Sequence, residues 1–78
     1  MSEPSVILLY EKRPSLEEAQ KKVGGLVELI SLSDGDQLLV NEEGLFHDLP
    51  YNEFASYLAG RRIVGDAVIL RGQAKWID

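Results

Sequence analysis

The segment 24–45 constrains the fold most, because it carries two apolar runs separated by a turn. The first run is LVELISL at 26–32 and the second is QLLVN at 37–41. Between them stands Ser-Asp-Gly-Asp at 33–36, and an Asp-Gly pair between apolar runs is a strong β-hairpin signal. Both faces of the first run are mostly apolar, so we expect an interior or interface-lining strand there. We therefore predict a hairpin as the centre of the fold.

An apolar strand and a capped helix are predicted before the hairpin. The run VILLY at 6–10 is continuously apolar. Such a run is typical of a strand covered on both faces, so we expect it at the centre of the sheet. The motif SLEE at 15–18 matches a capping box, which predicts a helix that ends at Gly24. Its predicted packing face consists of Leu16, Ala19 and Val23.

A second helix and a last strand are predicted after the hairpin. Residues 51–59 predict about two helical turns, capped by Asp48 or Asn52 and ended by Gly60. The run IVGDAVIL at 63–70 predicts a strand that a bulge or turn interrupts at its Gly-Asp pair. The inward-facing stripe of the second helix is predicted to consist of Tyr51, Phe54, Tyr57 and Leu58.

The order of these elements defines the predicted fold class. It reads β-α-β-β-(β)-α-β, where the bracketed strand is a short one at 45–46. We predict a single small α+β domain over residues 1–78, with an antiparallel-dominated sheet of about four strands and two short helices. The hairpin sets the register of the sheet, and we expect both helices to cover the same face.

The composition excludes several classes of protein. The chain is 45% hydrophobic and 27% charged, as globular proteins are, and it contains no cysteine for a disulfide or a thiolate metal site. Its net charge of −5 argues against nucleic acid as a partner. It has neither a basic leader nor an apolar run of about 20 residues that would span a membrane. We therefore expect a cytoplasmic protein without membrane attachment.

The sequence leaves two chemical interpretations open. His47-Asp48 is the only histidine-containing pair, and a minimal hydrolase would need it to activate a serine. A small molecule or nucleotide would find cations and a stacking ring at a dimer cleft near Arg61, Arg62 and Tyr57. No nucleophile motif, calcium-loop spacing or phosphate-binding loop is present. We predict no enzymatic activity, no catalytic residue, no metal and no cofactor.

Acidic turns and a C-terminal tryptophan are the candidate binding residues. Asp34 and Asp36 stand at the hairpin turn, and Glu42 and Glu43 stand at the following Asn-Glu-Glu-Gly turn. Carboxylates on exposed turns suit a basic partner surface. Trp76 either folds back onto the core or meets a partner. An exposed last strand would also allow strand pairing in a homodimer.

Three segments of the chain carry a resemblance to a known family. They are GGLVELISLSDGDQLLVNEEGL at 24–45, LPYNEFASYLAG at 49–60 and IVGDAVIL at 63–70, about the last two-thirds of the chain. They resemble a small phage-associated domain of unknown function. That resemblance implies no established activity, but it implies a phage-encoded protein in an infected bacterial cytoplasm. Because small acidic phage proteins commonly act by binding, we expect an accessory protein that binds and modulates a host protein through its acidic hairpin.

Overall fold

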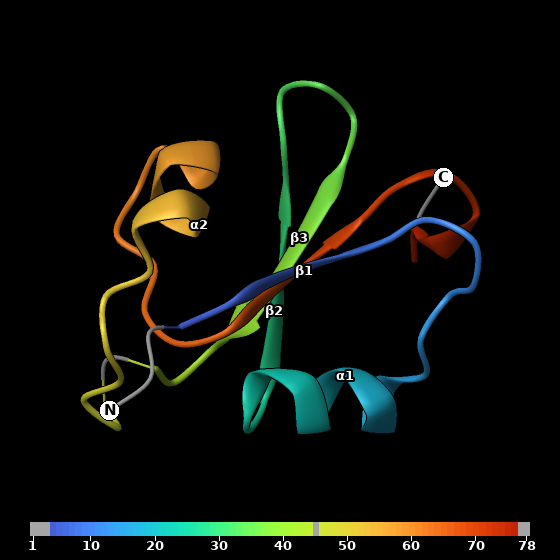
Figure 1. Cartoon of the computed structure of the whole chain (residues 1–78). Helices are drawn as coiled ribbons and strands as arrows, with labels where there is room; N and C mark the ends of the chain where they lie inside the picture. Colours follow the sequence, from blue (N-terminus) through green and yellow to red (C-terminus); the bar gives the residue numbers. More distant parts are fainter. Residues whose placement is uncertain (1–3, 45, 77–78) are drawn as a thin grey trace.

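The computed structural model describes residues 4–44 and 46–76, which form a four-stranded sheet and two α-helices (Figure 1). This arrangement confirms the predicted α+β class and the order β-α-β-β-α-β. The short strand predicted at 45–46 is not formed at Phe46, which lies in a turn, and Leu45 lies outside the described residues. The elements are β1 (Val6–Leu9), α1 (Leu16–Val23), β2 (Val27–Ser31), β3 (Gln37–Asn41), α2 (Glu53–Ala59), β4 (Ala67–Leu70) and the short 3-10 helix η1 (Gly72–Ala74).

The predicted hairpin is formed by β2 and β3, which pair in antiparallel register from Val27 opposite Asn41 to Ser31 opposite Gln37. β3 continues the sheet antiparallel to β4, and β4 pairs with β1 in parallel, so the strand order is β1-β4-β3-β2. Gly35 makes the hairpin turn at φ 94°, a left-handed conformation that glycine adopts without steric strain. The sheet is therefore mixed but mostly antiparallel.

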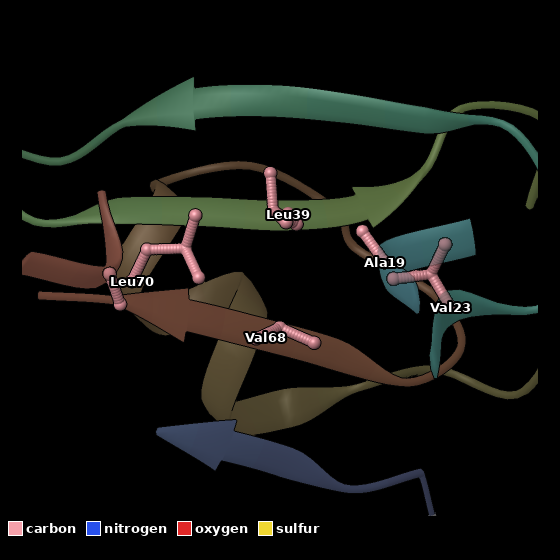
Figure 2. Packing of buried hydrophobic residues seen from close by; sticks show 6 residues of the cluster. Ala19, Val23, Leu39, Val68 and Leu70 are labelled. Atoms are coloured by element: carbon pink, nitrogen blue, oxygen red, sulfur yellow. The ribbon is translucent and has the colours of Figure 1, made fainter. Parts of the chain in front are cut away.

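The interior strands are β3 and β4, and every residue of both is buried. The central position predicted for the apolar run at 6–10 is wrong, because β1 lies at one edge of the sheet (Figure 2). Ile7 and Leu8 on β1 are 39% and 42% exposed. β2 lies at the other edge and is partly exposed. The strand predicted last in the sequence, β4, lies between β1 and β3. It therefore has no free edge that could pair with another chain, contrary to the expectation of an exposed last strand.

The two helices cover opposite faces of the sheet, which corrects the expectation that both cover one face. Leu38 and Leu39 are adjacent and fully buried, yet Leu39 packs with residues of α1 (Figure 2), whereas Leu38 packs with residues of α2. Successive side chains of a strand point to opposite faces, so a strand apolar at every position needs a cover on each side. The α1-side cluster consists of Ala19, Val23, Leu39, Val68, Leu70 and Ala74. The α2-side cluster consists of Leu38, Val40, Ala55, Ile63, Ala67 and Ile69.

The start of α1 is the predicted capping box. The hydroxyl of Ser15 accepts a hydrogen bond from the Glu18 N–H at 3.1 Å, and the Glu18 carboxylate accepts one from the Ser15 N–H at 2.9 Å. The helix ends at Gly24 as predicted. Val23 is buried as expected, whereas Leu16 at the first helical position is 55% exposed. Local hydrogen bonding thus sets both ends of α1.

Asn52 sets the start of α2 and ties the helix to the sheet. Its Oδ1 accepts a hydrogen bond from the Ala55 N–H at 3.1 Å, which makes Asn52 the N-cap in place of the alternative Asp48. Its Nδ2 donates to the Gly65 carbonyl at 2.8 Å and to the Ser5 carbonyl at 3.2 Å. The residue is 3% exposed. α2 therefore begins two residues later than predicted and is anchored beside the start of β1.

The predicted interruption of the last strand occurs at Gly65. Its φ is 81°, and a Cβ atom there would lie 2.8 Å from Cδ1 of Leu49. Before it, Val64 forms an isolated antiparallel bridge with Tyr51, and β4 begins only at Ala67. The predicted strand at 63–70 is therefore divided into a bridge that holds the start of α2 and a shorter strand inside the sheet.

The capping box predicts a pH-dependent contribution to stability. Hydrogen bonds from the backbone and then the hydroxyl of Ser15 lower the pKa of Glu18 from its ordinary 4.5. A carboxyl group whose pKa falls on folding stabilises the fold above its unfolded pKa, and this contribution is lost as the pH falls through the folded pKa. We expect the free energy of unfolding to decline below pH 4.5 and Glu18→Gln to reduce that decline, in urea titrations at a series of pH values.

The neighbouring substitution Glu17→Gln is the matched control, because it removes an exposed carboxylate outside the capping box. If Glu18→Gln and Glu17→Gln changed the pH dependence equally, the capping box would not be its source.

Candidate functional site

Three aromatic residues at the start of α2 and along its outer side form an exposed surface, here called the aromatic face. Tyr51, Phe54 and Tyr57 follow one another at a spacing of three residues and are 50%, 55% and 82% exposed. The prediction that these three residues point into the core is wrong, whereas Leu58, the fourth member of the predicted stripe, packs against the α2-side cluster. Exposed aromatic residues grouped in this way are typical of surfaces that bind another molecule.

The inner side of α2 explains why the aromatic rings point outwards. Ala55 is fully buried, and Ser56 is 7% exposed. The Ser56 hydroxyl accepts a hydrogen bond from the Ile63 N–H at 2.8 Å and donates one to the Ile63 carbonyl at 3.1 Å. These small side chains let the helix lie close to the sheet. The adjacent Ala-Ser pair was the sequence signal for the inner side, and hydrophobicity alone pointed to the wrong side.

A groove of about 580 Å³ adjoins the aromatic face. Pro4 and Val6 line it from the β1 side, and Tyr51, Glu53 and Phe54 line it from the α2 side. The remaining lining residue is the N-cap of α2, whose amide group is already hydrogen-bonded within the fold. The groove is therefore continuous with the aromatic face and carries one charged lining residue, the exposed Glu53.

The four acidic candidates lie at opposite ends of β3 and do not meet. Asp34 and Asp36 precede the strand, whereas Glu42 and Glu43 follow it. At about 3.3 Å per residue, roughly 20 Å of strand separates the two groups. The hairpin therefore carries two separate acidic turns rather than one acidic surface.

The carboxylate of Asp36 is engaged in an ion pair with Arg71. Arg71 approaches its Oδ2 atom with Nε at 3.0 Å and Nη2 at 2.8 Å, and the Asp36 side chain is 12% exposed. Hydrogen bonding and Coulomb attraction to this carboxylate raise the pKa of Arg71. Asp34 is exposed, and its Oδ1 accepts a hydrogen bond from the Asp36 N–H at 3.0 Å. Of the two acids at the hairpin turn, Asp34 is the one that a partner would reach.

The second acidic turn is attached to the end of α1 through Asn41. The Asn41 side chain donates to the Val23 carbonyl at 3.1 Å and accepts from the Glu43 N–H at 2.8 Å. Glu42 is exposed, and Glu43 is half-buried with its Oε1 atom 3.9 Å from Nε2 of His47. The carboxylate of Glu42 therefore points to solvent from a well-anchored turn.

Trp76 folds back onto the α1-side core, one of its two predicted placements. Its indole Nε1 donates to the Pro14 carbonyl at 2.9 Å, and its backbone N–H donates to the Gln37 side chain at 2.7 Å. The ring is half-buried against the α1-side cluster. The neighbouring Ile77 lies outside the described residues. Trp76 thus closes one end of the core and is far less exposed than the aromatic face.

The described residues do not form the histidine–serine pair that the hydrolase interpretation requires. The side chain of His47 is 60% exposed. Within residues 4–44 and 46–76 it forms no hydrogen bond with a serine, and the buried Ser56 is engaged by Ile63. In the same ranges no three histidine, aspartate or glutamate side chains gather as a metal site. The described helices include none with the length and apolarity to cross a membrane.

Within one copy of the chain the arginine region does not form a nucleotide-sized pocket, and a ligand site at a dimer cleft stays a prediction. Arg61 makes a 2.8 Å ion pair with Glu28, and the guanidinium of Arg62 lies 5.5 Å from the centroid of the Tyr51 ring. The cleft lined by the two arginines measures about 60 Å³. Small-molecule sites usually measure about 300–1,000 Å³. The cations there are held by neighbours on the protein surface.

The comparisons with known proteins identify the family. The family model described as a domain of unknown function, DUF3846, matches residues 1–77, so the chain belongs to this family. No curated protein and no solved structure matches the chain significantly. The match includes β1 and α1, which lie outside the three segments that carried the sequence resemblance.

Removing the Asn52 side chain should destabilise the fold. We expect Asn52→Ala to lower the free energy of unfolding by about 2–4 kcal/mol, because it removes the N-cap and the Nδ2 donor of the buried Gly65 carbonyl, whereas the Ser5 carbonyl keeps its hydrogen bond from the Ala67 N–H. Asn52→Asp keeps the acceptor of the cap but loses both donors, and should recover no more than the capping part, about 0.5–2 kcal/mol. Urea denaturation measures both values. Wild-type stability in Asn52→Ala would contradict this structural role.

The two aspartates of the hairpin turn should differ in their effect on stability. Asp36→Asn weakens the ion pair with Arg71, so we expect a lower Tm, whereas Asp34→Asn keeps an oxygen that caps the turn and should leave the Tm unchanged. Each variant removes one negative charge from the same turn, so each controls for the other. Equal Tm values in differential scanning calorimetry would contradict the structural role of Asp36.

Proposed function

We propose that this protein is a small accessory protein that acts by binding, and that its partner is a host bacterial protein in a phage-infected cell. The phage and cytoplasmic setting rests on the sequence resemblance. The binding role rests on the aromatic face, formed by Tyr51, Phe54 and Tyr57, which is the single observation that carries the proposal.

The aromatic face has the composition of an interface centre. A small domain buries a limited share of its surface. A fold that leaves Phe54 and Tyr57 on α2 and Tyr51 just before it exposed therefore gives up the stabilisation that their burial would provide. Tyrosine and phenylalanine supply large, rigid contact areas, and tyrosine is enriched among residues that dominate binding energy. Arg62 beside the Tyr51 ring adds a cation at the margin of the face. These features support a partner surface that is apolar at its centre and has an acidic group at its rim.

The acidic turns are proposed to have a different role in the same binding reaction. Asp34 and Glu42 are exposed, and the whole chain carries a net charge of −5. Charges outside the centre of an interface mainly raise the association rate and its dependence on salt. In this proposal the aromatic face supplies the affinity, and the acidic turns orient the approach of a partner with basic groups near its binding surface. The partner is modulated because the bound domain occupies its surface.

The first test is affinity capture with the wild-type protein from a lysate of a phage-susceptible bacterium, followed by titration calorimetry with the purified captured protein. We expect Tyr57→Ala and Phe54→Ala each to raise the Kd about tenfold or more, the loss of an interface residue that contributes about 1.4 kcal/mol. Leu16→Ala is the matched control, because Leu16 is an apolar residue of similar exposure on α1, on the opposite face of the sheet.

The second measurement separates the acidic turns from the aromatic face. Asp34→Asn combined with Glu42→Gln should slow association at low salt and leave dissociation nearly unchanged. Wild-type affinity in both aromatic variants would remove the aromatic face from the interface. Failure of the wild-type protein to retain any stoichiometric host protein would overturn the proposed function.

A further inference from the structure

The outer edge of β1 has the properties of a strand-pairing surface. β1 is an edge strand of the sheet, and in the described part of the chain it pairs only with β4. Ile7 and Leu8 on β1 are 39% and 42% exposed, and Tyr10, directly after the strand, is 58% exposed. Natural edge strands usually carry charges, proline or bulges that prevent pairing. Residues 6–10 contain no charged residue, proline or glycine.

The hydrogen bonds to β4 show which backbone groups point outwards. The Ala67 N–H donates to the Ser5 carbonyl and the Arg71 N–H donates to the Leu9 carbonyl, both at 2.9 Å. The backbone groups of alternate residues in a strand point to opposite neighbours, so those of Val6 and Leu8 point away from β4. A further strand would find these N–H and carbonyl groups at the edge.

We propose that two copies of the chain form a homodimer by antiparallel pairing of β1 with β1, with Leu8 opposite the second copy's Leu8 on a two-fold axis. In an antiparallel ladder the outward-pointing residues of both strands must face each other, which limits the register to steps of two. With Leu8 on the axis, Val6 lies opposite Tyr10 and Ile7 lies opposite Leu9, so every residue of the apolar run gains an apolar neighbour. With Ile7 on the axis instead, Tyr10 would lie opposite Pro4, which has no N–H to donate.

Charge complementarity favours a second copy as the occupant of this edge. In the same register, Lys12, which lies in a bend three residues after the end of β1, comes near the second copy's Pro4. Pro4 lines the groove that also contains the exposed carboxylate of Glu53. The lysine of the bend after each β1 is therefore close to the acidic groove of the other copy, once on each side of the axis. A parallel arrangement would bring Lys12 beside Lys12 instead. Because each copy carries a net charge of −5, these local contacts select the register against overall repulsion.

The dimer would have a defined shape. A two-fold axis perpendicular to the sheet joins the two four-stranded sheets into one of eight strands and keeps corresponding faces on the same side. Both α2 helices, with their aromatic faces, then lie on one side of the continuous sheet. If the proposed function holds, the dimer offers two equal binding surfaces to a partner with paired sites, which strengthens binding through effective concentration.

Sedimentation equilibrium over a dilution series tests the pairing. We expect the wild-type protein to approach twice the 8.7 kDa mass of the chain as its concentration rises. Leu8→Lys places two ammonium groups opposite each other on the axis and should raise the dimer Kd more than about tenfold. Leu26→Lys is the matched control, because Leu26 is 50% exposed and precedes β2 at the other edge of the sheet. Circular dichroism of each variant verifies the fold.

A charge exchange tests the register at two exposed positions that do not contribute to the core. Lys12→Glu and Glu53→Lys should each weaken dimerisation by about fivefold, and the double variant should restore it.

A monomeric mass of the wild-type protein throughout the series, or equal dimerisation of Leu8→Lys and Leu26→Lys, would overturn the proposal. Failure of the double variant to recover would overturn the antiparallel register. None of these measurements contains a host protein, so a monomeric result leaves the proposed function standing, and loss of host binding leaves the dimer standing.

Discussion

The structure depends on the burial of β3 and β4 on both faces. Leu38 and Leu39 are neighbours in sequence, point to opposite sides of the sheet and are both fully buried. Such a pair of strands exposes apolar side chains to water unless each face receives its own helix. α1 covers one face and α2 covers the other, while the strands at the two edges are less completely covered. The division of 78 residues into three layers leaves few for shielding the margins.

The exposed surfaces follow from this arrangement. α2 approaches the sheet through small residues, so its aromatic side chains face solvent, and β1 remains at an edge with apolar side chains exposed. Buried polar groups are fully used within the fold, because every buried side-chain nitrogen and oxygen of the described residues has a hydrogen-bond partner. Asn41 and Asn52 illustrate this, since each joins a turn or helix cap to a distant carbonyl. The accessible features include the exposed aromatic rings, the outer edge of β1 and surface charge, and the proposed binding role rests on these.

The sequence predicted the local positions of the candidate site residues but not their contacts with distant parts of the chain. The acidic residues were chosen correctly as turn residues, but their separation by β3 and the ion pair of Asp36 with Arg71 depend on contacts between distant parts of the chain. Trp76 likewise contacts the Pro14 carbonyl, 62 positions away in the sequence. The aromatic stripe of α2 was visible in the sequence, yet its direction was not. A period of three to four residues defines one side of a helix and does not determine which side meets the sheet.

The sequence by itself determined the local elements of this protein. The capping box of Ser15 and Glu18, the hairpin turn at Gly35 and the end of α1 at Gly24 rest on hydrogen bonds and dihedral preferences within a few residues. Only the tertiary structure decided the strand order, the opposite placement of the helices and the exposure of Tyr57 and Leu8. The physical reason is that apolar runs such as that of β1 satisfy burial equally well in several arrangements. The competition among all elements for the two faces of one small sheet selects among them.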